Sequence, residues 1–206
     1  METDLVVAGA GGFAREVAWL IKDLNREQLR WNLVGFWDSE PAGSVMGLPV
    51  FTTEEILRMP GCQVVVAVGN PERRARIARE AADAGLSFAT LVHPSVRRDP
   101  SVHIGAGSIL CAGSTLTVDI EIGQHVIVNL HCTIGHDSRI ADFVTLSPGC
   151  HLSGRTSIAE GAFMGSGAVT VEGASIGSAS IIGAGAVVIR DVAPKTTAVG
   201  VPARPR

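Results

Sequence analysis

Aliphatic residues recur at every sixth position through the C-terminal half of the chain. The series begins at Ile104 and ends at Val188, and Thr170 is its only polar member. Its members are Ile104, Leu110, Leu116, Ile122, Val128, Ile134, Ile140, Leu146, Leu152, Ile158, Met164, Thr170, Ile176, Ile182 and Val188. A period of six fits neither a helix nor an alternating strand, and it is typical of a solenoid of short strands separated by turns. The pattern therefore predicts a β-helix of stacked coils.

A second series follows the first at a distance of four residues, and its members are small or β-branched. Ser108, Cys132 and Ala186 are examples. We expect the large aliphatic side chains to point into the β-helix and the small ones to fill its corners. If three six-residue units form one triangular coil, the fifteen units make five coils. At one strand spacing per coil the prism would be roughly 24 Å tall.

The N-terminal part of the chain follows a different pattern, in which short apolar runs alternate with helical periodicity. Leu5–Ala8 is an apolar run typical of a buried strand, and the glycine-rich Gly9–Ala14 leads into a helical pattern through Ile21. The further elements expected are strands over Leu33–Asp38 and Val64–Val68 and helices over Thr53–Leu57 and Pro71–Ala84. This alternation predicts a small parallel α/β domain.

The glycine-rich turn after the first strand is a candidate phosphate site. Gly9, Gly11 and Ala14 form a GxGxxA pattern, which lets a phosphate approach backbone N–H groups at a helix N-terminus. Its alternative interpretation is a tight turn without a ligand. Asp38 and Gly69-Asn70 end two further strands, which places them at the carboxyl edge where open α/β sheets bind ligands. A unit of this size supplies one mononucleotide-binding half, so a nucleotide-sugar fits better than a dinucleotide.

Composition and charge narrow the function classes. The 206 residues carry a net charge of −3, which gives no general electrostatic reason to expect nucleic acid as a partner. No stretch approaches the roughly 18 apolar residues of a membrane span, and Glu2 and Asp4 precede the first apolar run, unlike in a signal peptide. The cysteines show no CxxC spacing, and Cys132 and Cys150 lie one coil apart, which favours buried thiols in a reducing compartment. We therefore expect a cytoplasmic protein.

Several sequence runs carry a resemblance to a known family. Ile134-Gly135-His136-Asp137, Ile182–Val187 and Gly200–Arg204 resemble the hexapeptide acyltransferases, which fold as left-handed parallel β-helices. With Val6–Gly12 at the start, the whole chain is similar to the sugar O-/N-acetyltransferases grouped with sialic acid O-acetyltransferase. Relatives there include UDP-4-amino-sugar and GDP-perosamine N-acetyltransferases. The resemblance implies a Rossmann-like nucleotide-sugar-binding domain over residues 1–91 and a left-handed β-helix acyltransferase domain over residues 92–206.

The resemblance also implies which residues hold the nucleotide-sugar. In the amino-sugar members these are the residues that match Gly9, Ala10, Gly11, Gly12, Phe13, Asp38, Gly69 and Asn70. Phe13 departs from the family pattern, because many relatives have His there. Asn129 matches an asparagine that contacts the substrate. Between the domains, His93 of a His-Pro-Ser run is expected to be structural, and Arg97-Arg98 to form a solvated turn.

His136 is the candidate general base. It follows an inward aliphatic residue by two positions, so it should face outward from a turn. Acetyl transfer from a thioester to an amine or hydroxyl needs a proton acceptor with a pKa near neutrality, which histidine supplies. Asp137, the next residue, is expected to fix its tautomer and stabilise the imidazolium. By resemblance, the pair matches the catalytic His-Glu of UDP-amino-sugar acetyltransferases, with Asp in place of Glu.

The acyl donor implied by the resemblance is acetyl-CoA. Gly154, Gly165 and Gly183 match later coils along which the pantetheine arm lies between two subunits of a homotrimer. Gly154 stands one coil after His136, and its backbone N–H is a candidate oxyanion donor. Thr145 stands where some amino-sugar enzymes have a second histidine near the acetyl group.

Three functions compete on these grounds. The first is an acetyl-CoA-dependent acetyltransferase of a nucleotide-linked amino sugar, acting by direct transfer with His136 as base and without a metal; sialic-acid-type O-acetylation is its variant. The second is a γ-class carbonic anhydrase, because His131 and His136 have an H-x4-H spacing, although about two coils before His136 stands Ser95 in place of a third ligand. The third is a non-catalytic scaffold that binds a nucleotide-sugar.

Overall fold

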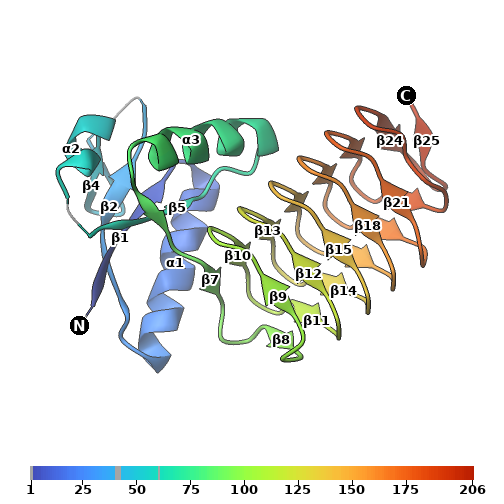
Figure 1. The fold of residues 1–206 in the computed structure, drawn as a ribbon, viewed down its shortest axis with the longest axis horizontal. Coiled ribbons are helices and arrows are strands. Elements are labelled where there is room, and N and C mark those ends of the chain that lie inside the picture. Colours follow the sequence, from blue (N-terminus) through green and yellow to red (C-terminus); the bar gives the residue numbers. More distant parts are fainter. Residues whose placement is uncertain (1, 40–42, 60) are drawn as a thin grey trace.

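The structure is a computed structural model that describes residues 2–39, 43–59 and 61–206. It places an N-terminal α/β unit at one end of a long prism of short strands, and the C-terminus lies at the far end of the prism (Figure 1). No helix among the described residues is long and apolar enough to span a membrane.

The N-terminal unit is a six-stranded sheet with helices on both faces. Its strand order is β3-β4-β2-β1-β5-β6, and only β3 is antiparallel to its neighbour. The strands are β1 (Thr3–Ala8), β2 (Trp31–Trp37), β3 (Ser44–Val45), β4 (Leu48–Phe51), β5 (Gln63–Val66) and β6 (Ser87–Phe88), and the helices are α1 (Gly12–Glu27), α2 (Thr53–Leu57) and α3 (Pro71–Asp83). The predicted helices and strands are confirmed, with ends that differ by a few residues.

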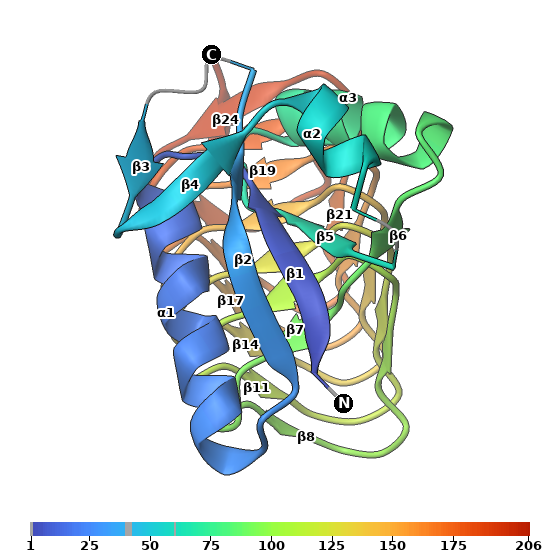
Figure 2. The ribbon, with the colours of Figure 1, turned by 90° about the vertical axis from the view of Figure 1, so that its left-hand side faces the viewer.

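The apolar runs of this sheet are continuous because each strand is buried on both faces. Leu5 and Val7 of β1 pack in one cluster with α1, while Val6 and Ala8 pack in another with Ile56 of α2 and residues of α3. Figure 2 shows α1 as a long helix running beside β1 and β2. The carboxyl ends of β1, β2 and β5 lie together, since Ala8 pairs with both Trp37 and Val66.

The prism has three faces, and each face is a stack of short, mainly parallel strands. Face I contains β7 (Leu91–Val92), β10 (Ile109–Leu110), β13 (Ile127–Val128), β16 (Thr145–Leu146), β19 (Phe163–Met164), β22 (Ile181–Ile182), β24 (Thr197–Val199) and the antiparallel β25 (Arg204–Pro205). Face II contains β8 (Arg97–Arg98), β11 (Thr115–Leu116), β14 (Thr133–Ile134), β17 (His151–Leu152), β20 (Val169–Thr170) and β23 (Val187–Val188). Face III contains β9 (His103–Ile104), β12 (Glu121–Ile122), β15 (Arg139–Ile140), β18 (Ser157–Ile158) and β21 (Ser175–Ile176).

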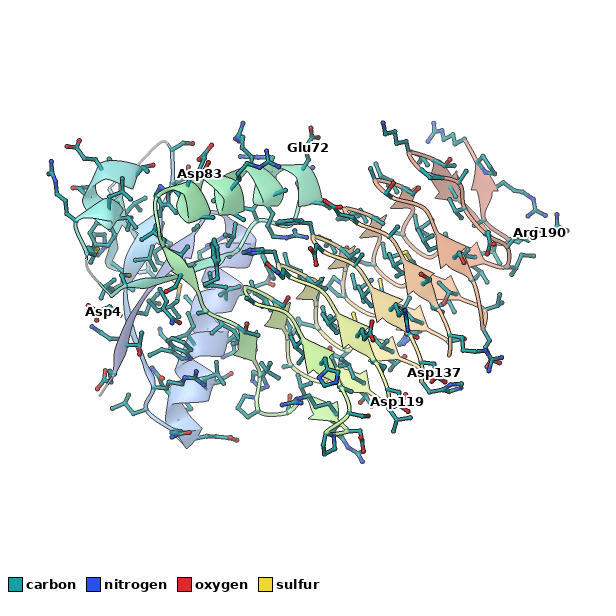
Figure 3. The ribbon with its side chains drawn as sticks, in the orientation of Figure 1. Asp4, Glu72, Asp83, Asp119, Asp137 and Arg190 are labelled. Carbon is teal, nitrogen blue, oxygen red and sulfur yellow. The ribbon has the colours of Figure 1, made fainter. Side chains whose placement is uncertain are left out.

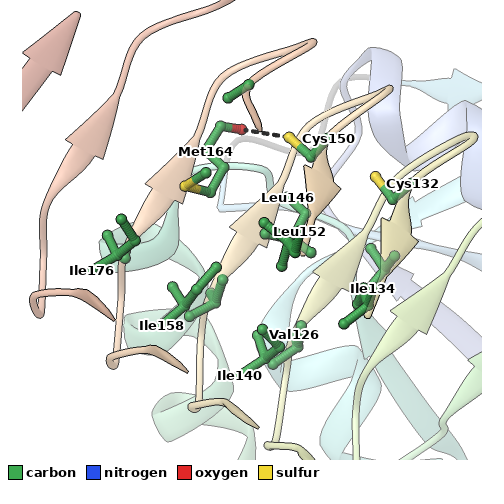
Figure 4. Close-up of a cluster of buried hydrophobic side chains, with 14 of the residues drawn as sticks. Val126, Cys132, Ile134, Ile140, Leu146, Cys150, Leu152, Ile158, Met164 and Ile176 are labelled. Atoms are coloured by element: carbon green, nitrogen blue, oxygen red, sulfur yellow. Dashed lines mark hydrogen bonds between the residues drawn. The ribbon is translucent and has the colours of Figure 1, made fainter. Parts of the chain in front are cut away.

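The register confirms that three six-residue units form one coil. Ile109 pairs with Ile127 and Thr115 with Thr133, so each of these residues lies beside the one 18 positions later. The side chains of the aliphatic series point into the prism, and those of the small series are buried near its corners. Cys132 and Cys150 belong to the small series and stack one coil apart as free thiols (Figure 4). Cys150 Sγ donates to the carbonyl of Met164 at 3.6 Å.

The β-helix begins earlier than the aliphatic series indicates, at β7. Arg97 and Arg98 were expected to form a solvated turn, but they form strand β8. This strand pairs through its backbone with Thr115 and Leu116 of β11. Both side chains are nevertheless exposed, as expected at an end of the prism where no earlier coil covers them. The strand was missed because Arg98 occupies a position that is aliphatic in the next coils, where Leu116 and Ile134 stand.

The two parts of the chain share a core. On the outer side of face I, Leu91, Ile109 and Ile127 are buried in the same cluster as Val17 and Ile21 of α1. Sheet, helix and prism are thus held together by apolar packing, which fixes how the ligand-binding edge of the sheet is oriented relative to the coils.

Candidate active site

His136 lies in the turn between β14 and β15, at the corner where faces II and III meet. Its side chain is 46% exposed, and Nδ1 lies 2.7 Å from Oδ2 of Asp137. Asp137 adopts φ 59°, a left-handed conformation that aspartate tolerates and that brings its carboxylate beside the ring. A carboxylate only accepts hydrogen bonds, so the proton of the neutral imidazole is held on Nδ1 and the lone pair on Nε2. That is the protonation state a general base needs.

Gly154 supports the imidazole from the next coil. A Cβ built on Gly154 would lie 2.5 Å from His136 Nε2, so any side chain here would displace the ring. Arg155 N donates to His136 O at 2.7 Å and holds the two turns in register. The sequence prediction that Gly154 lies beside His136 is therefore confirmed in geometry, while its role as an oxyanion donor stays a prediction.

Two charged residues at this corner were missed by the sequence analysis. Glu172 Oε1 lies 3.7 Å from His136 Nε2 and 2.9 Å from Nη2 of Arg155. Glu172 stands 36 residues, or two coil lengths, after His136, so counting along the repeat would have found it. The side chain of Arg155 is 62% exposed and that of Glu172 is 50% exposed.

The other predicted acyl-donor residues do not gather around His136. Gly165 and Gly183 lie at the corner of faces I and II, where a Cβ on Gly165 would meet the backbone of Gly183 and Ala184. Close stacking of coils thus accounts for Gly165 by itself. Thr145 is 4% exposed on face I, and its hydroxyl donates to Gly69 O at 2.8 Å. Within one chain Thr145 belongs to the contact between the two domains, and its predicted contact with the acyl donor has no support there.

Asn129 also lies at the corner of faces I and II, separated from His136 by strand β14. Its Oδ1 accepts from Leu130 N at 2.7 Å, and the side chain is partly buried. His131 lies in this same turn, so His131 and His136 occupy different corners of one chain. Among the residues that the structure describes, no group of three or more His, Cys, Asp or Glu side chains could hold a metal ion. The carbonic anhydrase alternative therefore finds no metal centre within the described part of the chain.

The predicted nucleotide edge has the expected geometry. Gly9 adopts φ 111°, which favours glycine, and the N–H of Ala10 donates to Oδ2 of Asp38 at 3.1 Å. Gly11 caps α1, Gly11 and Gly12 are exposed, and the first turn of the helix carries no acidic side chain. The helix N-terminus therefore keeps its positive potential toward solvent, as an anion site requires.

A cleft of about 270 Å³ opens at this edge. It is lined by Gly9, Trp37, Asp38, Ser39, Thr53, Val68, Arg73, Arg76, Ile77 and Glu80. Phe13 lies outside the cleft lining and packs against the apolar cluster of α1. Arg73 and Arg76 of α3 line the cleft and are side chains that can pair with phosphate groups. Asp38 and Glu80 line it too, and Glu80 lies 3.9 Å from Arg76.

Gly69 and Asn70 connect this edge to the β-helix. The side chain of Asn70 caps α3 by accepting from Arg73 N at 2.8 Å, and Gly69 O accepts from Thr145. On their other side a hollow of about 540 Å³ is floored by Phe163 and by Ile181, which is 48% exposed. The loop thus stands between the cleft and a second, more apolar hollow.

Arg74 is a buried cation that the sequence analysis did not single out. Its side chain is fully buried and donates to five backbone carbonyls, those of Val68, Gly69, His125, Phe143 and Val144. Burial lowers the pKa of Arg74 to about 9, which still leaves it charged at neutral pH. It fastens the nucleotide loop to two turns at the corner of faces I and III.

The nucleotide edge and His136 lie on different sides of the molecule. Face I and its two corners contact the N-terminal unit, whereas His136 occupies the remaining corner, opposite face I. Figure 3 shows Asp137 along the lower edge of the prism and Glu72, in the first turn of α3, along the upper edge. One chain therefore does not bring its own nucleotide loop to its own base.

Comparisons with known proteins agree with this architecture. Residues 4–81 match the family model of the PglD N-terminal domain. The chain is 36% identical to the acetyltransferase domain of PglB from Neisseria gonorrhoeae, solved in complex with acetyl coenzyme A, with 100% of both chains covered and a TM-score of 0.92. It is 33% identical to a variant of perosamine N-acetyltransferase from Caulobacter crescentus, solved with CoA and GDP-perosamine, with 98% of this chain and 96% of that one covered and a TM-score of 0.90.

WeeI from Acinetobacter baumannii is 29% identical, with 99% of this chain and 100% of that one covered and a TM-score of 0.89. No curated protein sequence matches the chain significantly. The solved relatives extend over both the Rossmann-like sheet and the left-handed β-helix, and their identity to the chain is high enough to decide the family. With its His-Asp pair on the β-helix and its glycine turn on the sheet, the chain belongs to the hexapeptide-repeat sugar acetyltransferases, and it is an acyltransferase.

Proposed function

We propose that this protein transfers the acetyl group of acetyl-CoA to the amino group of a nucleotide-linked sugar, with His136 as general base. The observation that carries the proposal is the His136–Asp137 pair, in which a 2.7 Å contact holds the proton on Nδ1 and directs the lone pair of Nε2 outward. Whole-chain likeness to relatives solved with acetyl-CoA, and with CoA and GDP-perosamine, supports the donor and the class of acceptor.

The reaction follows from these groups by direct transfer. The acceptor nitrogen attacks the thioester carbonyl, a C–N bond forms, and a proton passes from nitrogen to His136 Nε2. Collapse of the tetrahedral intermediate breaks the C–S bond, and the thiolate of CoA takes the proton back from the imidazolium. Asp137 stabilises the imidazolium in between. We assign the Gly154 N–H as the donor that stabilises the oxyanion, because Gly154 lies directly against the ring of His136.

The active protein is a homotrimer in this proposal, with sites shared between neighbouring chains. The support is geometric: the nucleotide edge adjoins face I, and His136 lies at the opposite corner. A closed ring in which face II or III of one chain meets the N-terminal unit of the next would bring the two halves of a site together. Gly165 and Gly183 would then line the donor path from the corner of faces I and II, and Asn129 would contact the acceptor from that same corner.

The nucleotide half of the proposal assigns the phosphates to the turn Gly9–Phe13 and the cleft beside it. Asp38 and the Gly69-Asn70 loop border the nucleoside. The cysteines Cys62, Cys111, Cys132 and Cys150 are all free and buried, which supports a reducing compartment such as the cytoplasm.

The test is a transfer assay on the purified protein. UDP-, GDP- and CMP-linked 4-amino sugars are first ranked by the rise in melting temperature that each produces, since a ligand at 100 times its Kd adds about 2.7 kcal/mol to stability. Release of free CoA thiol and the mass of the acetylated sugar are then measured with acetyl-CoA. For at least one amino sugar we expect a product that is about 42 Da heavier than the substrate, because one acetyl group has replaced one hydrogen of the amine. Absence of acetylation for every amino sugar that binds would contradict the proposal.

A further inference from the structure

Two charged side chains beside His136 have no part in the mechanism above. Glu172 reaches the corner of faces II and III from two coils away, and Arg155 reaches it from one coil away. Glu172 Oε1 lies 3.7 Å from His136 Nε2, and Arg155 Nη2 lies 2.9 Å from the same oxygen. Three successive turns thus place an imidazole, a guanidinium and a carboxylate at one exposed point.

Two hydrogen-bond acceptors, His136 Nε2 and the carboxylate of Glu172, face each other across a gap of 3.7 Å. Because Asp137 holds the proton on Nδ1, the neutral ring offers only a lone pair at Nε2, and the carboxylate of Glu172 likewise only accepts. Their separation of 3.7 Å is too long for a direct hydrogen bond. A single donor atom placed between them satisfies both, provided that it carries at least two hydrogens.

This requirement separates an amine from an alcohol. A primary amine carries two hydrogens on one nitrogen, or three when protonated, and can donate to Nε2 and to Glu172 at once. A hydroxyl carries one hydrogen and leaves one acceptor facing an oxygen lone pair. His136 is 46% and Glu172 is 50% exposed in the free chain, so an acceptor bound over them displaces water from both. An amine replaces both lost hydrogen bonds, whereas a hydroxyl leaves one of the two groups without a partner and is disfavoured.

Charge at the corner points the same way. Asp137 and Glu172 each carry one negative charge and Arg155 carries one positive charge, so with a neutral His136 these four side chains have a net charge of −1. Asp119, in the turn one coil before, adds a further negative charge. A sugar amine is largely protonated at neutral pH and arrives as a cation. A corner with excess negative charge favours that cation over a neutral hydroxyl.

We infer that Glu172 is a specificity-determining residue that recognises the acceptor amino group together with His136, and that Arg155 is the positioning residue that holds it. This inference rests on the proposed function and deepens it by assigning the choice of a primary amine to a named carboxylate. The bound ammonium first releases one proton to solvent past Glu172. The neutral amine then attacks the thioester, its second proton passes to Nε2, and the CoA thiolate takes that proton as it leaves.

The test compares two acceptors that differ only at the reacting position. They are the nucleotide-linked amino sugar that the wild type uses best and the same nucleotide-sugar with a hydroxyl in place of the amino group. For Glu172→Gln we expect kcat/KM on the amine to fall by about 10- to 100-fold, mainly through KM, because a charged hydrogen bond is lost. Turnover of the hydroxyl analogue should be unchanged or higher, and the KM for acetyl-CoA should not move.

A pH profile adds a readout that a purely structural role would not move. Loss of the carboxylate beside His136 acts on the base with either acceptor, and only the amine also loses the attraction for its ammonium form. Relative to the profile of the hydroxyl analogue, the rise of kcat/KM with pH should therefore move to higher pH for the amine. Arg155→Gln keeps the carboxylate and should give a smaller change in the same direction. Glu160→Gln removes an exposed carboxylate at another corner and serves as the matched control.

The outcomes separate the inference from the proposed function. If the wild type acetylates an amino sugar while Glu172→Gln keeps the same amine-to-hydroxyl ratio and pH profile, the inference is wrong and the Arg155–Glu172 pair only joins coils. Equal losses of melting temperature in Glu172→Gln and Arg155→Gln, without a change of selectivity, would say the same. If the wild type acetylates no nucleotide-linked amino sugar at all, the proposed function itself is wrong.

Discussion

Gly154 lies against the imidazole of His136, so that a methyl group on residue 154 would sit 2.5 Å from Nε2. The contact joins a coil turn to the proposed base one coil below it. The φ angle of Gly154 is not in the left-handed region, so its backbone conformation does not require glycine. Only the contact with the His136 ring does.

The first prediction follows from that contact. Gly154→Ala should lower kcat by about 10²-fold or more, because the ring must move away from its productive position. The melting temperature should change little, since the ring is half exposed and can swing outward. Gly85→Ala is the control: it lies just after α3, away from this corner, has open space around its Cβ, and has φ 76°. That variant should lose stability but keep its turnover, and the opposite pattern would contradict the assigned contact.

The second prediction concerns the base. His136→Ala should lower kcat by roughly 10²- to 10⁴-fold, the usual contribution of a general base, while the fold survives because the side chain is an exposed turn residue. Asp137→Asn keeps a side chain that tolerates the left-handed turn, so its smaller loss would report orientation of the ring alone. Steady-state kinetics and thermal melts of both variants provide the measurement. A larger loss in Asp137→Asn than in His136→Ala would reverse the roles.

The third prediction separates the two ligands. A Cβ on Gly11 meets no atom within 4 Å, and φ at this residue is −82°, so Gly11→Val should fold normally. Its side chain would project where phosphates are expected, and nucleotide-sugar affinity should fall. Calorimetry should show an unchanged affinity for acetyl-CoA. Gly9→Val, by contrast, should destabilise the protein, because residue 9 has φ 111° and its Cβ would lie 3.1 Å from Ala67 O.

The fourth prediction tests whether sites are shared between chains. His136→Ala has an intact nucleotide edge, and Gly11→Val has an intact base. Unfolding and refolding the two variants together should restore about a quarter of wild-type turnover, since one pairing in four combines the two intact halves in a ring. Light scattering should show trimers throughout. Mixtures no more active than the separate variants would place the whole site within one chain.

The fifth prediction concerns acid stability. His125 is 4% exposed, its ring stacks on Phe143 at 5.1 Å between centroids, and Phe88 meets it edge-on. Burial, assisted by the charge of Arg74, lowers the pKa of His125 from its ordinary value of 6.5 to about 4. Between these pH values the unfolded chain binds a proton at His125 and the folded chain does not. The contribution of His125 to the free energy of unfolding is therefore fully present above pH 6.5 and is lost as the pH falls toward 4.

That difference corresponds to about 3 kcal/mol. His125→Asn tolerates the φ of 52° and does not titrate, so its melting temperature should fall less steeply than that of the wild type between these pH values. His103→Asn, which removes an exposed histidine, should leave the wild-type slope intact. Parallel slopes for all three proteins would contradict a buried neutral His125.

Local patterns predicted most of the architecture because each coil repeats one short rule. Ile134 and Leu152 both point inward at the same register, and the period alone was enough to place them. Arg98 broke that rule, and the strand Arg97–Arg98 was missed, since an end coil has no coil before it to exclude charge. The same counting would have found Glu172, had the 18-residue coil been followed two turns beyond His136.

By itself, the sequence determined the period of the β-helix, the strand-turn-helix order of the N-terminal unit and the pairing of His136 with Asp137, because adjacent residues and regular spacing decide these features. Only the tertiary structure decided that Thr145 and Arg74 fasten the nucleotide loop, and that His136 stands opposite face I. Those relations depend on how one face of the prism packs against α1 and α3. Packing of distant segments is a property of complementary surfaces, which no single run of residues encodes.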